Sequence, residues 1–332
     1  MNVIIVGCNV FDSLEFHLAD SFRALGHNAR VIDVTGRGAL SKKIGYWSAR
    51  FAGSYDRVVG HRLATRIIHH NPDLVIVVYR HLHPVLVDDI KTTLPYVPVI
   101  QVNPDALSNL EKQQIIAADF DYYFSKEPYI VNLLRHKNGL NAYYLPEGFN
   151  PRVHCRPLPE KAVAERETVV DVLMYGSLYA YRARFVEQLL RAGLRVAIYG
   201  TKGPYLRSAI RAVFQGKYLV GDEKNRLVYG AKITLNTLHY AEITSANQKY
   251  FEINGIGGFQ LCDDKPTLSD YSAVPTELVT FRSLSDAIDK IRYYLARPAE
   301  RHELAEQQYQ HFQQHHTFDH RAIQLLQTIG LA

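Results

Sequence analysis

The sequence predicts an α/β protein built from two Rossmann-like domains that face each other across a cleft. The chain has 332 residues, more than one ordinary domain needs, and 47% of them are apolar, which is enough for sizeable cores. Short β-branched runs alternate with helical patterns twice along the chain, and this favours parallel, doubly wound sheets. Between 146 and 169 a polar, proline-punctuated stretch breaks the alternation and predicts a linker. A single eight-fold barrel is the alternative, against which the linker and a long helical tail argue.

The first half supplies the elements of an N-terminal domain, residues 1–155. Short β-branched or aromatic runs predict strands at 3–6, 29–34, 73–79, 97–102, 122–124 and 142–145. Between them, helical patterns occupy 13–25, 55–70, 84–92, 106–118 and 128–135. The run 73–79 is almost continuously apolar, as is typical of a strand buried on both faces.

The second half repeats the alternation in a C-terminal domain, residues 168–310. The same patterns predict strands at 169–175, 195–199, 233–236, 259–263 and 278–281. Helices are predicted at 182–192, 208–214, 225–229, 248–256 and 285–295. From 298 to 331 we expect mostly helix, interrupted near Thr317, and the last part, 311–332, forms a separate C-terminal helix.

Composition and motifs exclude several classes. No run of eighteen apolar residues marks a transmembrane helix, and the N-terminus reads as a buried strand, not a signal peptide. Cys8, Cys155 and Cys262 are few and far apart, which indicates a reducing compartment and a cytoplasmic protein. The turns after the strands at 3–6 and 169–175 each carry one glycine, so neither matches the dinucleotide fingerprint, and no Walker motif occurs.

A basic stretch at 36–70 interleaves arginine and lysine with aromatic residues. Such an element suits peripheral contact with anionic lipid at the cytoplasmic face of an inner membrane. A solvated basic face beside the acceptor site is the alternative. Nucleic acid is not expected as a partner, because no recognised nucleic-acid motif accompanies the patch.

The segment from Lys232 to Asp264 carries the most chemistry. Lys249 and Glu252 lie three residues apart on a predicted helix, and glycines that include Gly255 follow. A carboxylate there suits the two ribose hydroxyls of a nucleotide, while a cation and free backbone N–H groups suit its diphosphate. An i,i+3 ion pair followed by a glycine helix cap is the alternative.

Polar residues also follow other predicted strands, at the edge where parallel sheets bind ligands. In the second half, Gly200 and Lys202 suit a base and phosphate pocket, and Asn236 and His239 suit a sugar, with His239 also a candidate catalytic residue. In the first half, His81 and Asp105 are candidates for an acceptor-binding group or a general base, with a helix N-cap as the alternative for Asp105. The histidines at 81, 83, 311, 315 and 316 lack a recognised metal-site spacing, so no metal site is predicted.

The second half resembles the CgeB-like, spore-maturation type of glycosyltransferase within the group-1 glycosyltransferases. The resemblance covers roughly 169–321 and rests on the segments 249–264, 268–271, 277–279, 287–296 and 316–321. It implies the GT-B fold, a final helix that crosses back to the N-terminal domain, a nucleoside-diphosphate sugar as donor and no catalytic metal.

Matched residue by residue, the resemblance implies that Glu252 holds the donor ribose and that Lys249 contacts the diphosphate. The family's first glutamate would fall at Thr244, and Glu242 is two residues out of register. The family's glycine-serine turn and following arginine match four residues, with Arg184 the better arginine: Gly176, Ser177, Arg182 and Arg184.

The expected activity is hexosyltransferase-like transfer (EC 2.4) of a sugar from a nucleoside-diphosphate sugar, UDP-sugar favoured, to a hydroxyl of a glycan, lipid or protein. The resemblance implies that no further cofactor takes part and that the anomeric configuration is retained, in a role such as cell-surface glycan or protein glycosylation. A non-catalytic nucleotide- or sugar-binding protein on the same fold is the alternative. The sequence leaves the sugar, base, acceptor and oligomeric state open.

Overall fold

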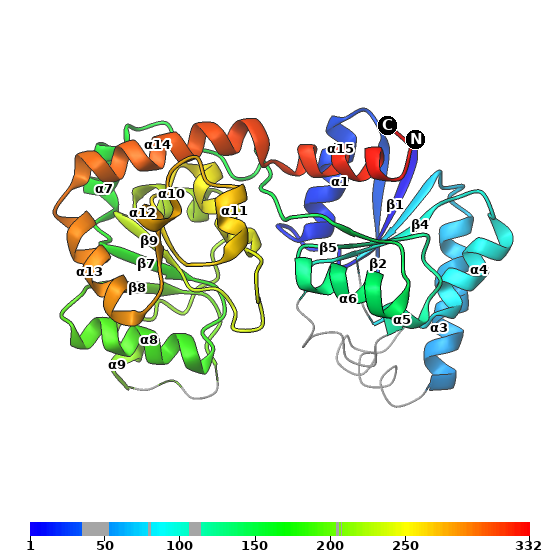
Figure 1. Cartoon of the computed structure of the whole chain (residues 1–332), viewed down its shortest axis with the longest axis horizontal. Helices are drawn as coiled ribbons and strands as arrows, with labels where there is room; N and C mark the ends of the chain where they lie inside the picture. The colour runs from blue at the N-terminus through cyan, green and yellow to red at the C-terminus, as the bar shows by residue number, and fades with distance from the viewer. Residues whose placement is uncertain (35–52, 79–80, 106–113, 204–205, 207) are drawn as a thin grey trace. The chain divides into compact units, whose positions relative to one another are not determined.

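A computed structural model describes residues 1–34, 53–78, 81–105, 114–203, 206 and 208–332, and these form two compact units. The first unit comprises Met1–Pro146 together with Phe318–Ala332, and the second unit comprises Glu147–Thr317. Both chain ends therefore belong to the first unit (Figure 1).

The first unit is built on a six-stranded parallel sheet in the order β2-β1-β3-β4-β5-β6. Its strands are β1 (Asn2–Gly7), β2 (Asn28–Asp33), β3 (Leu74–Val77), β4 (Val99–Asn103), β5 (Tyr122–Ser125) and β6 (Ala142–Tyr144). All four residues of β3 are buried, which agrees with its apolar sequence.

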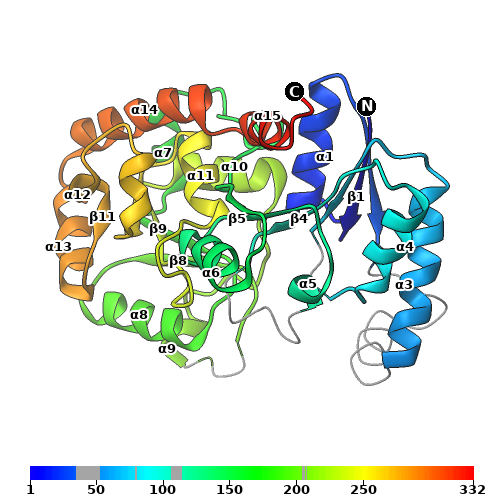
Figure 2. The same cartoon turned by 45° about the vertical axis from the view of Figure 1, so that its right-hand side comes forward.

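Helices cover both faces of this sheet. One face packs on α3 (Gly53–Ile68), α4 (Val85–Thr93), α5 (Gln114–Ala117) and α6 (Pro128–Asn138), of which α3 and α4 lie side by side (Figure 2). The other face packs on α1 (Leu14–Ala24) and the last helix, α15 (Phe318–Thr328). The return of the C-terminal helix to the N-terminal domain is thus confirmed.

The second unit repeats the architecture with five parallel strands in the order β11-β10-β9-β7-β8. They are β7 (Val172–Tyr175), β8 (Val196–Tyr199), β9 (Ile233–Asn236), β10 (Gln260–Asp263) and β11 (Thr280–Phe281). The two Rossmann-like domains that the alternation predicted are therefore confirmed.

Two helical layers enclose the second sheet. On one face lie α8 (Ala180–Arg191), α9 (Ser208–Arg211), α13 (Leu284–Leu295) and part of α14 (Pro298–His315). On the other lie α7 (Lys161–Thr168), α10 (Gly221–Gly230) and α11 (Gln248–Ile256). A short 3-10 helix, η3 (Pro266–Asp270), and α12 (Thr276–Val279) precede β11.

Two element predictions were wrong. The predicted linker contains α7, because Ala164 packs into the core beside α10 and Glu165 pairs with Arg301 of α14 at 2.6 Å. The strand expected at 278–281 is only two residues long, since 276–279 are helical. The structure divides the two units after Pro146 and after Thr317. The domain boundaries expected at 155, 168 and 311 stay predictions. Residues 106–113 of a predicted helix lie outside the described residues.

Candidate functional site in the second unit

The second sheet has one switch point, between β7 and β9, where the chain's progress across the sheet reverses direction. Leu173 of β7 pairs with Ala197 of β8 on one side and with Thr234 of β9 on the other. In open parallel sheets, ligands bind outside the carboxyl ends of the two strands at such a point. Gly176 and Thr237, directly after β7 and β9, mark that place here.

Arg182 joins the two strand ends. Its side chain leaves the first turn of α8, and Nη1 donates to the Ser177 carbonyl oxygen at 2.8 Å while Nη2 donates to that of Thr237 at 2.7 Å. The residue is only 6% exposed, and its Nε is buried without a hydrogen-bond partner. The guanidinium therefore stands buried at the switch point, held by neutral carbonyl groups only.

Lys249 reaches the same place from α11. Its Nζ donates to the Tyr175 carbonyl oxygen at 3.1 Å. A β-carbon built on Gly176 would lie 3.3 Å from this Nζ and 3.9 Å from Arg182 Nη1, so both cations face the same side of Gly176. Burial, and then the charge of Arg182, lower the pKa of the Lys249 ammonium to about 7.

The two cations lack an anionic partner in the part of the chain that the structure describes. No carboxylate there lies within ion-pair distance of Lys249 or Arg182, although other buried cations, such as Arg301, are paired. Two close positive charges in a partly desolvated place favour a bound anion. A phosphate or diphosphate fits this demand, because its oxygens accept from guanidinium and ammonium groups together.

Arg184 lies elsewhere, although the family pattern made it the better candidate. Its side chain is 57% exposed and pairs with Glu187 at 3.0 Å, one turn along α8. The sequence could not separate the two arginines, because the distinction depends on carbonyl groups of Ser177 and Thr237 that folding brings to Arg182.

The predicted glycines beside the site have different uses. Gly176 and Gly200 have φ of 109° and 124°, and a β-carbon at Gly200 would collide with the Gly176 carbonyl oxygen, so the turns after β7 and β8 require glycine. Ser177 accepts a hydrogen bond from Thr201 at 3.3 Å between these turns. Gly255 instead lies against the Phe149 ring, where a β-carbon would collide, and its role in binding stays a prediction.

An open hollow of about 1,000 Å³ adjoins the turn at Gly200. Its lining includes Thr201, Lys202, Leu206 and Phe214. Lys202 contributes a positive charge, and Leu206 and Phe214 contribute apolar surface. Lys202 is exposed, and its backbone pairs with that of Leu178, which fixes the turn relative to the first one. The hollow is large enough for a nucleoside.

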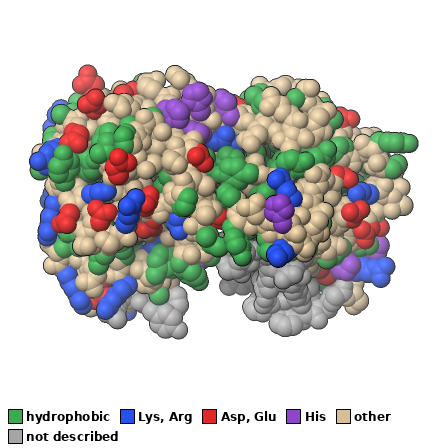
Figure 3. Space-filling view, in the orientation of Figure 1, with side chains coloured by type: hydrophobic (Ala, Val, Ile, Leu, Met, Phe, Trp, Pro, Cys, Tyr) green, Lys and Arg blue, Asp and Glu red, His purple; other side chains and the backbone are tan. Residues whose placement is uncertain are grey.

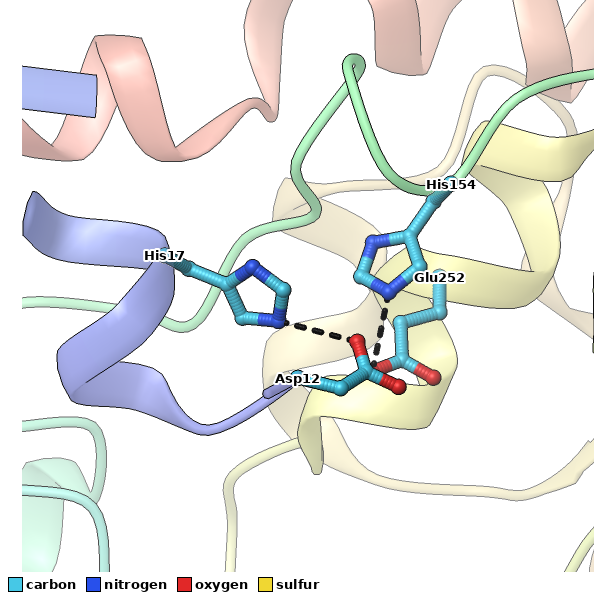
Figure 4. A group of neighbouring side chains, drawn as sticks. All are labelled: Asp12, His17, His154 and Glu252. Carbon is cyan, nitrogen blue, oxygen red and sulfur yellow. Dashed lines mark ion pairs between the residues drawn. The ribbon is translucent and has the colours of Figure 1, made fainter. Parts of the chain in front are cut away.

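Glu252 is buried in the second turn of α11, not at the helix start, and its carboxylate is well satisfied. Oε2 accepts from Lys224 Nζ at 3.2 Å and from the Tyr175 hydroxyl at 3.4 Å, while Oε1 accepts from Gln248 at 2.7 Å. His154 Nε2 lies 3.6 Å from Oε1 (Figure 4). Lys224 was not singled out from the sequence, since it lies 28 positions earlier on another helix.

Asn236 and His239 position the loop between β9 and α11. Asn236 is buried and bonds Asn247, whose side chain caps α11 by accepting from the Tyr250 amide. His239 Nδ1 accepts from the Ala241 amide at 3.1 Å, which places the proton of the neutral ring on Nε2. In that form His239 donates from Nε2, which suits binding a hydroxyl better than removing its proton.

Two acidic residues in the same loop region were missed or set aside by sequence reasoning. Asp263, at the end of β10, accepts from the Leu238 amide at 2.6 Å, and burial raises the pKa of its carboxyl. Glu242, out of register with the family's first glutamate, is buried and accepts from the His239 amide at 3.2 Å. The Thr244 carbonyl oxygen accepts from the Thr267 hydroxyl at 2.6 Å. The loop therefore carries a buried carboxylate despite the shifted position.

The corresponding place in the first unit is occupied by a side chain of the protein itself. Glu15, in the first turn of α1, accepts from the Cys8 amide at 2.8 Å, and a β-carbon at Gly7 would collide with this carboxylate. A phosphate would need that space and the same amides. Asp12, which follows β1, pairs with His17 at 3.1 Å (Figure 4). The first unit therefore offers no comparable anion site at this turn.

The other catalytic candidates of the first unit lie after its strands. Asp105 follows β4, where its backbone N–H and carbonyl groups both bond the Asn103 side chain, at 3.1 and 3.0 Å. His81 is partly exposed after β3. The basic stretch is described only from 53 onward, as α3, because 35–52 lie outside the described residues. None of the described helices is long and apolar enough to cross a membrane.

Histidine side chains gather on the surface over the C-terminal end of α14 (Figure 3). The rings of His311 and His315 have centroids 4.7 Å apart, and His316 lies 5.2 Å from His311. Burial and the His315 charge lower the pKa of His311. These three residues do not form a group of metal-ligand atoms in the described chain.

Comparison with known proteins bears on both the fold and the family. Sucrose-phosphate synthase from Thermosynechococcus elongatus aligns over 99% of this chain and 98% of its own, with a TM-score of 0.69 and 11% identity. Anabaena HepE in complex with UDP aligns over the full length of both chains, with a TM-score of 0.69 and 10% identity. The T4 phage β-glucosyltransferase covers 99% of both chains, with a TM-score of 0.57 and 12% identity. The fold is GT-B.

By sequence, residues 182–327 match the model of a family described as glycosyl transferase-like. No curated protein matches the sequence. The family match covers most of the second unit but less than half of the chain, and the structural neighbours show the fold. The matched segment begins at Arg182 in α8 and includes α11, which carries Lys249.

Proposed function

We propose that the protein transfers a hexose-like sugar from a nucleoside-diphosphate sugar to a hydroxyl acceptor, with the donor held by the second unit. The observation that carries the proposal is the pair of cations, Arg182 and Lys249, which face Gly176 at the switch point without a described carboxylate partner. The donor diphosphate takes the place of that missing partner.

The same two cations also stabilise the leaving group of the reaction, the nucleoside diphosphate. When the sugar leaves, negative charge grows on the diphosphate, and donors that are already in place stabilise that charge without rearrangement. Arg182 is fixed by Ser177 and Thr237, and Lys249 by Tyr175, so both are prearranged. We propose that they do this work without a catalytic metal, as two cationic side chains already balance a diphosphate.

The rest of the donor extends to either side of the diphosphate. We place the base in the hollow lined by Thr201 and Lys202, and the ribose near Glu252. For the ribose hydroxyls to reach Glu252, its bonds to Gln248 or Lys224 must yield. UDP is the favoured nucleotide, because HepE, which has the same fold, is in complex with UDP and with UDP and glucose.

We propose His81 and Asp105 of the first unit as acceptor-binding or general-base groups, since both follow strands of its sheet. We propose retention of the anomeric configuration from the family resemblance, together with a cytoplasmic location, peripheral membrane contact through the basic stretch, and a CgeB-like role in glycosylating a surface glycan or protein.

Substitution of the two arginines of α8 tests the proposal. Arg182→Ala is expected to weaken UDP binding about 10- to 100-fold, the cost of losing a hydrogen bond to a charged group. Arg184→Ala is the matched control, because it lies on the same helix, is exposed and pairs with Glu187. Calorimetric titration with UDP measures both affinities. Equal affinities in the two variants would contradict the placement of the diphosphate.

A non-catalytic binding protein on the same fold remains the second candidate, because Thr244 occupies the position of the family's first glutamate. Glu242 argues for catalysis, since it brings a buried carboxylate to the same loop. The two candidates differ in one measurement, which is the release of UDP from a UDP-sugar in the presence of acceptor glycans or water. Binding without any release would favour the second candidate.

A further inference from the structure

A cluster of four rings lies beside the cation pair in the second unit. Tyr179 and Tyr181 come from the start of α8, and His239 and Tyr240 come from the loop after β9. The His239 and Tyr240 ring centroids are 4.3 Å apart, and Tyr181 lies 5.7 Å from Tyr240. Tyr179 lies 5.3 Å from His239, which closes the cluster.

Two of the four rings are exposed to solvent, which distinguishes this cluster from the aromatic clusters of a protein core. Tyr240 is 76% exposed and Tyr179 is 46% exposed. Exposed aromatic rings that gather in one place mark a binding surface more often than isolated ones do. Their hydroxyl groups and the His239 ring add polar atoms at the edge of an apolar surface.

The protein holds these rings in place. The Tyr181 hydroxyl donates to the Leu238 carbonyl oxygen at 3.0 Å, and the amide of Leu238 donates to Asp263 at 2.6 Å. Glu242 accepts from the His239 amide at 3.2 Å, and Lys265 bonds the Glu242 carbonyl oxygen at 2.5 Å. A loop fixed at these points presents its rings at little cost in conformational entropy when a ligand binds.

The cluster also touches the diphosphate site. The Arg182 guanidinium carbon lies 5.4 Å from the Tyr179 ring centroid and 5.5 Å from that of Tyr181. A group bonded directly to a phosphate on Arg182 is therefore within one ring's width of these side chains. The base hollow at Gly200 and Lys202 takes the other end of the nucleotide.

We propose that Tyr179, Tyr181, His239 and Tyr240 form a stacking surface for a pyranose ring. A pyranose fits the chemistry of this surface, because one face of the sugar presents C–H groups to aromatic rings while its hydroxyls reach polar atoms at the edge. The ring belongs either to the donor sugar or to a saccharide acceptor. The inference rests on the proposed function for the position of the diphosphate.

Binding of matched ligands tests the surface. The probes are UDP, UDP-glucose, UDP-N-acetylglucosamine and methyl glucosides, titrated by calorimetry and followed by saturation-transfer NMR. Tyr240→Ala is expected to leave UDP affinity unchanged and to weaken UDP-sugar affinity about 2- to 10-fold, the usual range for one aromatic contact. Tyr240→Phe keeps the ring and is expected to restore the affinity.

Tyr293→Ala is the control, because Tyr293 is also an exposed tyrosine, at 42%, but lies on α13. A loss confined to UDP-sugars assigns the surface to the donor, and a loss confined to glucosides assigns it to the acceptor. An equal loss for UDP and UDP-sugars would show base stacking and overturn the proposal, as would no change with any sugar.

The two proposals fail separately. If the unsubstituted chain binds neither UDP nor UDP-sugars, the proposed function fails. The stacking surface is then tested by the glucosides alone: their saturation-transfer signals must be weaker with Tyr240→Ala than with the unsubstituted chain. Circular dichroism of each variant confirms that it is folded.

Discussion

At the scale of single residues, the charge of Lys249 decides how the site responds to pH. Burial and Arg182 lower the pKa of the ammonium to about 7, so the free site gives up a proton as pH rises through neutrality. A bound diphosphate favours the charged ammonium and raises its pKa. Above pH 7, binding must therefore take up a proton, whereas below pH 7 the proton is already in place.

We expect UDP affinity to fall as pH rises from 7 to 9, by up to about tenfold per pH unit. Calorimetry at pH 8 in two buffers of different ionisation enthalpy would detect the proton uptake. Lys249→Arg is the control, because a guanidinium stays charged throughout this range. Affinity that is flat with pH in the unsubstituted chain would show that Lys249 keeps its proton in the free site.

The residues of the site were predictable in part. Lys249 and the glycine turn at 176 could be found because their chemistry is written in consecutive residues. The roles of Lys224 and Asp263, and the choice of Arg182 over Arg184, could not be predicted. Each depends on groups that are distant in the sequence, such as the Thr237 carbonyl, 55 positions from Arg182.

At the scale of elements, the end of α11 shows what its glycines do. Gly257 caps the helix with φ of 86°, and a β-carbon there would lie 2.8 Å from Arg156 Nε. The left-handed backbone favours glycine, and a β-carbon would displace the Arg156 guanidinium, which pairs with Glu306 at 2.7 Å. The glycine run was interpreted as a place where backbone approaches a ligand, with a helix cap as the alternative, and for Gly257 the geometry is that of the cap.

Gly257→Ala is expected to lower the free energy of unfolding by about 1–3 kcal/mol and to leave UDP affinity unchanged. Gly193→Ala is the control, since Gly193 also has positive φ, 78°, but no atom lies near its missing β-carbon. That variant is expected to cost only the backbone part, about 1 kcal/mol. Denaturant unfolding of both variants measures the difference. Equal losses would remove Arg156 from the explanation.

Helices and strands whose apolar residues recur at regular spacing were predicted correctly. Elements that depend on tertiary contacts were not. The helix at 248–256 and the strand at 233–236 have the predicted bounds. The helix α7 reads as polar linker because its stabilising contacts, including that of Glu165 with Arg301, come from a helix more than a hundred residues away.

At the scale of the whole molecule, alternation of strands and helices was sufficient to predict two doubly wound sheets, because parallel strands need crossover helices. This alternation did not predict that the first unit is made of two separate segments of the chain. Its last helix, α15, follows the entire second unit in sequence, and only the family resemblance placed it back on the first sheet.

This arrangement predicts that the C-terminal residues stabilise the start of the chain. Leu325 and Ala322 are fully buried in the core that Val3, Ile5 and α1 form, and Phe318 stacks on His17 with centroids 5.1 Å apart. Leu325→Ala should cost about 2–5 kcal/mol, as a large-to-small change in a core does. Ile323→Ala is the control on the same helix, because its side chain is exposed.

Hydrogen exchange followed by mass spectrometry would locate the loss. We expect faster exchange in β1, α1 and β3 of Leu325→Ala, because these elements share a core with α15. UDP added to the unsubstituted chain should instead slow exchange around Gly176 and in α11, since ligand binding stabilises the elements that hold it. Faster exchange spread equally over both sheets of Leu325→Ala would mean that the two units unfold as one, and slower exchange confined to the first unit on adding UDP would place the donor site there.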